Sequence, residues 1–271
     1  MVELLATLGI IALLIGLLIP ALNVVRRAAK ETKQKAQFTT IGLALTTFKN
    51  DYGDYPPSDW VLPGTPGSDY CGAQKFTEAL LGWDMLGFHP KSDFRSHGRN
   101  DNGVFIYDAN NPVFFDQRRD PYLELASTNT FRLGSVSVLR QGLFLDTGPL
   151  APNTFVLCDV FGDKKIMLAN GKTTRAGAPI LYYRANASGR TISEIYNALD
   201  NDAIINIKQT SDGRIHPLAD PSNQYQYFYD YIRDPKISAR PWPYRPDSYI
   251  LISAGVDGLY GTGDDIRNFG N

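Results

Sequence analysis

Cysteine, histidine and net charge are all scarce in this sequence. Of its 271 residues, two are cysteine and three are histidine, and 27 basic residues stand against 28 acidic ones. Two cysteines are too few for the disulfide framework of a small secreted scaffold, and a net charge of −1 is unlike that of a nucleic-acid-binding protein. The histidines lack the spacing of a zinc finger or a helical zinc pair, so we expect all three in turns or at the surface: His89, His97 and His216.

The signatures of common enzymes are missing as well. The sequence has no Gly-x-Ser-x-Gly elbow and no Walker loop, and the Gly-Thr-Gly at 261–263 is too short to surround a phosphate. Acidic residues are frequent, but no two stand out as the acid and base of a hydrolase. We therefore predict that the protein is not an enzyme, with a catalytic site assembled from residues distant in the sequence as the alternative.

A long apolar run begins close to the N-terminus. The 22 residues from Leu4 to Val25 carry no charge, and as a helix they would span about 33 Å, the thickness of a bilayer core. The apolar region of a secretory signal is usually about 7 to 15 residues long, and a buried core helix is rarely apolar around its whole circumference. The run therefore predicts a membrane-spanning helix that stays in the mature protein.

Beyond the apolar run the helical pattern becomes amphipathic. The apolar residues that repeat there at helical spacing are Phe38, Ile41, Leu45 and Phe48. Asp, Gly and Pro residues between 51 and 57 predict the end of the helix. We expect one long helix over residues 1–53, with its amphipathic half packed on a globular head over residues 54–271.

Two residues of this helix are unusual for a simple anchor. A carboxylate at membrane depth, as at Glu3, is costly enough to indicate a function, and its partner would belong to another molecule. Pro20 lacks the N–H that would bond to Gly16, so it would kink the helix or melt it locally. A harmless membrane kink and a functional hinge both fit this position.

The stretch from Glu3 to Leu14, together with Pro20, resembles the helix start of type IV pilins and of the pseudopilins of type II secretion. In that family the glutamate lies close to an N-methylated phenylalanine that begins the mature chain. The resemblance therefore implies that this sequence begins two residues late and that the processing site lies outside it. It also implies that Glu3 pairs with the methylated amine of an adjacent subunit, and that Glu3 and Pro20 serve assembly.

Two further segments resemble the major pseudopilins. Residues 41–59, IGLALTTFKNDYGDYPPSD, are similar to the family's transition from helix to loop. Residues 253–258, SAGVDG, with residues 264–269, DDIRNF, resemble the family's C-terminal calcium loop. Residues 59–246 show no such resemblance, and they form a much larger body than the usual head of a major pseudopilin.

Three aspartates in the C-terminal segment suit a hard cation. Residues 248–252, SYILI, predict a short buried strand, and the glycines after it allow a tight curve. The curve would bring together Asp257, Asp264 and Asp265, and three carboxylates without Cys or His suit Ca²⁺ better than Zn²⁺ or copper. Asp-Gly clusters are also common in plain turns, but the resemblance favours a structural Ca²⁺.

Between the two ends, strand-like runs alternate with turn residues, which predicts an α+β fold with the long helix packed on an antiparallel sheet. The expected strands are 103–107, 154–160, 179–184 and 203–207. The expected short helices are 78–87 and 193–199, and the expected long loops are 59–73 and 108–121.

Two features of the head leave alternatives open. Alternating tyrosines at 225–231 predict a strand whose aromatic face covers the sheet, with a sugar platform, a subunit contact or a charge-transfer stack as alternatives. Cys71 and Cys158 are either a disulfide, which would close a loop of about 88 residues and stabilise by about 4 kcal/mol, or two free buried thiols.

The predicted function is that of a structural subunit of a type IV pilus-like filament. The resemblance implies a bacterial inner-membrane precursor with an extracytoplasmic head, which prepilin peptidase and the assembly machinery convert into a periplasmic or extracellular homopolymer. A major secretion pseudopilin and a major surface pilin both fit. The alternative from another class is a single-pass membrane-anchored enzyme or ligand-binding domain, which gives no reason for Glu3.

Overall fold

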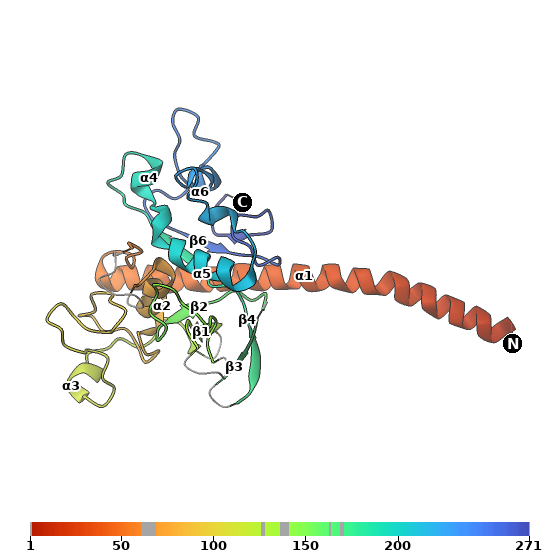
Figure 1. The fold of residues 1–271 in the computed structure, drawn as a ribbon, viewed down its shortest axis with the longest axis horizontal. Helices are drawn as coiled ribbons and strands as arrows, with labels where there is room; N and C mark the ends of the chain where they lie inside the picture. The colour runs from red at the N-terminus through yellow and green to blue at the C-terminus, as the bar shows by residue number, and fades with distance from the viewer. Residues whose placement is uncertain are drawn as a thin grey trace.

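The computed structural model consists of one long helix, α1 (Val2–Tyr52), and a globular head that surrounds its C-terminal half (Figure 1). It describes residues 2–60, 69–125, 128–135, 141–162, 164–168 and 171–270. The N-terminal half of α1 extends away from the head, and the C-terminus of the chain lies within the head (Figure 1). The part of the predicted 59–73 loop between 61 and 68 falls outside the described residues.

The predicted amphipathic half of α1 is confirmed. Each of its buried residues has another buried residue three or four positions away, so they form one face of the helix, as burial against a single surface requires. They are Gln34, Phe38, Ile41, Ala44, Leu45 and Phe48. The helix ends at Gly53, whose N–H donates to Lys49 O at 2.7 Å and whose φ of 86° favours glycine.

Three polar side chains fasten α1 to the backbone of residues 158–161. Lys30 Nζ donates to Phe161 O at 2.9 Å, and Gln37 Nε2 donates to Cys158 O at 3.0 Å. The side-chain oxygen of Gln34 accepts from Val160 N at 3.0 Å. Apolar packing and hydrogen bonds therefore both fix the angle at which the helix enters the head.

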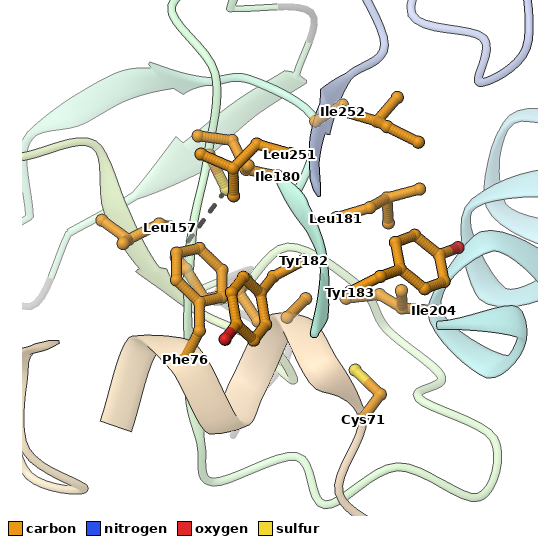
Figure 2. Close-up of a cluster of buried hydrophobic side chains, with 14 of the residues drawn as sticks. Cys71, Phe76, Leu157, Ile180, Leu181, Tyr182, Tyr183, Ile204, Leu251 and Ile252 are labelled. Atoms are coloured by element: carbon orange, nitrogen blue, oxygen red, sulfur yellow. Dashed lines mark hydrogen bonds between the residues drawn. The ribbon is translucent and has the colours of Figure 1, made fainter. Parts of the chain in front are cut away.

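The centre of the head is strand β5 (Leu181–Arg184), which lies between helices α2 (Gly72–Leu81) and α5 (Asp202–Asp212) (Figure 2). Tyr182 stacks on Phe76 of α2 at 5.2 Å between ring centroids, while Tyr183 points to the side of Ile204 on α5. Gly72 is required here, because a Cβ at this position would lie 2.4 Å from Tyr182 O.

The fold class is α+β as predicted, but the prediction of a single antiparallel sheet is wrong. Within the described residues the strands form three small antiparallel sheets. Their members are β1 (Thr130–Arg132) with β2 (Phe155–Leu157), β3 (Lys164–Met167) with β4 (Thr173–Ala176), and β5 with β6 (Tyr249–Ser253) and β7 (Ile266–Arg267). The expected strands at 154–160, 179–184 and 248–252 correspond to β2, β5 and β6.

Two expected strands are helices. Residues 203–207 belong to α5, because a short apolar run has the same pattern in a strand and in a buried helix. The Tyr225–Tyr231 segment forms α6 (Gln226–Ile232), in which Phe228 and Ile232 share the buried face. These two residues alternate with the tyrosines and are four positions apart, so the segment also has helical apolar spacing. Phe228 packs on Tyr183 at 4.9 Å between ring centroids.

The other short elements deviate less from expectation. The helix expected at 78–87 lies earlier, at α2, because Gly82 ends it with a φ of 88°. The expected 193–199 helix is divided into α4 (Ile192–Ile195) and η2 (Ala198–Asp200), and η3 (Pro217–Ala219) follows α5. Residues 103–107 make only an isolated bridge, through Phe105, and the 108–121 loop contains α3 (Pro112–Phe115).

Candidate functional site

The exposed half of α1 is the first candidate site. One helix of the described chain, within Thr7–Tyr52, is long and apolar enough to cross a membrane, and none of its apolar window is buried in the head. Its large apolar side chains are exposed all around the helix, as at Leu4, Ile10 and Leu18. Such a surface is unfavourable in water and requires lipid or other protein around it.

Glu3 and Pro20 both lie on this half of α1. Glu3 is exposed near the free end of the helix, and within the described residues it makes no hydrogen bond or ion pair. Pro20 does not melt the helix, because α1 is continuous from Val2 to Tyr52. Instead, the exposed half curves gently away from the axis of the buried half (Figure 1).

The C-terminal loop between β6 and β7 is the second candidate site, and Asp264 organises it. Its Oδ2 accepts from Val256 N at 2.7 Å and from Asp257 N at 3.0 Å, while its Oδ1 accepts from Thr262 Oγ1 at 2.7 Å. Burial alone would raise the pKa of Asp264, but these hydrogen bonds hold that pKa below its usual value. Asp264 is therefore the anion around which the loop folds.

The adjacent Asp265 is held by a different set of groups. Its Oδ2 accepts from Tyr231 Oη on α6 and from Gly261 N, the latter at 2.8 Å. Burial raises the pKa of Asp265 to about 7. The tyrosine hydroxyl on α6 therefore engages Oδ2 of Asp265, whereas its Oδ1 is buried without a hydrogen-bond partner within the described residues. That all three aspartates face one cation stays a prediction.

Three side chains earlier in the chain brace the same loop, two from the connection after α5 and one from α6. Arg214 Nη1 donates to Asp257 O at 2.6 Å, and Tyr227 Oη donates to Gly261 O at 2.6 Å. His216 Nδ1 accepts from Tyr260 N at 3.1 Å, and its Nε2 lies 3.2 Å from Asp212 Oδ2. These braces join residues 34 to 44 positions apart, so no local sequence signal pointed to them.

All three histidines lie outside the helices and strands, as expected, but they differ in burial. His97 is exposed as predicted, but His89 and His216 are fully buried. Burial lowers the pKa of both, which favours neutral imidazole rings in the head. Both ring nitrogens of His216 face protein groups, so its role is to join α5 to the C-terminal loop.

The structure brings two of the predicted Ca²⁺ ligands, Asp257 and Asp264, directly together. No three residues among His, Cys, Asp and Glu are grouped for a metal within the part of the chain that the structure describes. The Asp257 side chain does lie within hydrogen-bonding reach of the Asp264 carboxyl. Two adjacent carboxylates repel each other unless a cation or proton lies between them, and Ca²⁺ completes such a pair with carbonyl and water oxygens.

Both cysteines are free and buried, which is the second of the two predicted arrangements. Cys71 immediately precedes α2, and Cys158 immediately follows β2. Burial raises the pKa of the Cys71 thiol to about 12, so this thiol is protonated and unreactive in the folded head.

Comparison with known proteins does not extend these findings. No family model, no curated protein and no solved structure matches the chain.

Proposed function

We propose that the protein is a structural subunit of a type IV pilus-like filament, which polymerises through the exposed half of α1. In this proposal the head lies on the extracytoplasmic side of a bacterial inner membrane, and the exposed half of α1 lies in the bilayer until assembly. Prepilin peptidase and the membrane-bound assembly machinery are the expected partners before assembly, and further copies of the chain are the partners afterwards. The role is structural rather than catalytic.

The observation that carries the proposal is the division of α1 into two surfaces. Its second half is buried on one face by the head, whereas its first half is apolar and exposed. Helices of this kind pack equally well against lipid and against one another. One surface therefore serves both the membrane-bound and the assembled state.

Glu3 has a specific part in this proposal. A carboxylate within an apolar helix bundle is costly unless an opposite charge neutralises it. Within the described residues Glu3 has no partner on its own chain. By resemblance the partner is the methylated N-terminal amine of the adjacent subunit, and this pair would fix the axial register between subunits.

Filaments sheared from the producing cells provide the test, by electron microscopy and mass spectrometry. We expect fibres whose main component is this chain, and we expect Glu3→Gln to abolish them while the protein still inserts and folds. Glu31→Gln is the matched control, because Glu31 lies on the same helix but already pairs with Arg27 at 3.0 Å. Normal fibres from Glu3→Gln would remove Glu3 from the proposal.

If no fibres are found, size-exclusion chromatography of the detergent-extracted protein distinguishes two explanations. A monomer in detergent that never associates would favour the single-pass anchored domain, whereas detergent-dependent oligomers would favour a short secretion pseudopilus. A structural Ca²⁺ held by Asp257 and Asp264 belongs to the pseudopilin version of the proposal. There the ion would neutralise the two carboxylates and stabilise the curve of the loop.

A further inference from the structure

Basic residues are concentrated in two short segments of the chain. Residues 26–35 and 163–176 contain nine Lys and Arg residues against two acidic ones, Glu31 and Asp163, whereas the whole chain has a net charge of −1. The nine residues, called the basic cluster below, are Arg26, Arg27, Lys30, Lys33, Lys35, Lys164, Lys165, Lys172 and Arg175. All of them except Lys164 are exposed. The remainder of the chain is net negative, so this positive charge is local.

The fold brings the two basic segments together. Lys30 Nζ on α1 donates to Phe161 O, just before β3, at 2.9 Å, although the two residues are 131 positions apart. Lys164 Nζ at the start of β3 donates to Ser211 Oγ near the end of α5 at 3.1 Å. Strands β3 and β4 lie at the end of the head from which the exposed half of α1 emerges (Figure 1). The basic cluster therefore faces the side on which the membrane would lie.

Exposed aliphatic side chains accompany the basic cluster at this end. Ile215, which follows the end of α5, is 80% exposed. Its neighbour Arg214 donates through Nη1 to Asp257 O at 2.6 Å, and Val256 beside that contact is exposed as well. Large aliphatic residues exposed among Lys and Arg are typical of surfaces that lie at a membrane interface.

The length of α1 brings this end of the head to the bilayer surface. The apolar run ends at Val25, and the head fastens the helix at Lys30 and Gln34, five and nine residues later. These separations correspond to about 8 to 14 Å along the axis. The headgroup layer on each side of a bilayer core is about 5 to 8 Å thick. With the apolar run in the bilayer, the head is therefore too close to avoid the headgroups.

We propose that the basic cluster is a contact surface for anionic phospholipids, which holds the head against the membrane while α1 lies in the bilayer. Lipid phosphates supply the negative charge that complements the cluster, and each Lys or Arg near such a surface strengthens the association by about fivefold. The inference rests on the membrane-bound state of the proposed function and not on the filament. Departure of the chain from the membrane would require release of these contacts.

Lysine acetylation tests the contact directly. The full chain is inserted, one copy per disc, into nanodiscs of phosphatidylcholine alone or with about one third phosphatidylglycerol, and acetylation is followed by mass spectrometry. We expect Lys33, Lys165 and Lys172 to react at least about threefold more slowly in the anionic discs. Lys91, between α2 and α3, and Lys236, after α6, are exposed elsewhere on the head and should react equally in both. Comparison of the same lysine in two lipids cancels its intrinsic reactivity.

Two variants with the same change of net charge assign the effect to the cluster. The cluster variant is Lys33→Gln with Lys35→Gln and Lys165→Gln, and the control variant is Lys91→Gln with Arg190→Gln and Lys236→Gln. All six side chains are exposed, so both variants should fold. The cluster variant should lose most of the slowing at Lys172, and the control variant should keep it. The same response at Lys172 in both variants would overturn the proposal.

Insertion of α1 is measured separately in the same discs, by hydrogen exchange of residues 7–25. Protected amides there, together with equal acetylation of the cluster in the two lipids, would overturn the lipid contact and leave the filament proposal intact. Slowing at Lys91 and Lys236 equal to that of the cluster would also overturn it, because the head would then have no preferred face. A chain that enters neither kind of disc would contradict the membrane-bound state and this inference with it.

Discussion

Two leucines of α1, two positions apart, provide a sensitive test of how the helix is held. Leu45 is completely buried against the head, whereas Leu43 is 70% exposed. Truncation of a fully buried leucine to alanine typically costs about 2 to 5 kcal/mol, since it removes apolar contact and leaves a cavity. We therefore expect Leu45→Ala to lower the free energy of unfolding by about 3 kcal/mol and Leu43→Ala to lower it by less than about 0.5 kcal/mol.

The assay is urea unfolding of the full chain in detergent micelles, followed by tryptophan fluorescence. All three tryptophans, Trp60, Trp83 and Trp242, lie outside α1, so the signal reports unfolding of the head rather than of the micelle-bound half of α1. For a domain of this size, 3 kcal/mol corresponds to a decrease in the unfolding temperature of about 6 to 12 °C. Equal effects of the two substitutions would refute the packing face assigned to α1.

Three further predictions concern the head. Burial raises the pKa of Asp200 from 3.8 to about 7, so between these pH values the folded state holds a proton that the unfolded state has lost. The free energy of unfolding should therefore fall by up to about 4 kcal/mol as pH rises from about 4 to 7. In urea titrations at several pH values, the free energy of unfolding of Asp200→Asn should depend less steeply on pH. Iodoacetamide should label Cys71 and Cys158 only after unfolding, because both are buried, and mass spectrometry of native protein carrying label would contradict this. Millimolar Ca²⁺ should raise the unfolding temperature, with the increase absent in Asp264→Ala and kept in Asp265→Asn.

The long helix was the part most accessible to prediction. Its apolar run, its amphipathic continuation and its end at Gly53 depend on contacts within a few residues along the chain, so the pattern is present in the sequence itself. The strand at β6 was predictable for the same reason, since five apolar or small residues lie between turn residues. Elements of this kind carry their own signal.

The head was less predictable because tertiary contacts decide its elements. The 203–207 run and the Tyr225–Tyr231 segment are helices whose apolar residues meet at β5. Ile204 lies beside Tyr183 (Figure 2), and Phe228 packs on the same ring. Both patterns also fit a strand. The three small sheets are likewise set by which short segments meet in space, and the sequence contains no local record of this.

The C-terminal loop shows the same limit within a candidate site. That the aspartates bend into one loop could be predicted from the glycines around them. That Tyr231 binds one oxygen of Asp265 could not, because Tyr231 lies 34 residues earlier, on α6. Sequence proximity predicted the composition of the site but not the direction of each carboxylate.

The way in which α1 is fastened to the head also has a mechanical consequence. The buried face from Gln34 to Phe48 extends for about 20 Å along the helix axis, with hydrogen bonds at its start and Tyr122 Oη donating to Asp51 Oδ2 at 2.7 Å near its end. A tensile load along α1 would therefore act in shear on all these contacts at once, rather than peeling them one by one. Under such a load the head and the buried half of α1 would move together.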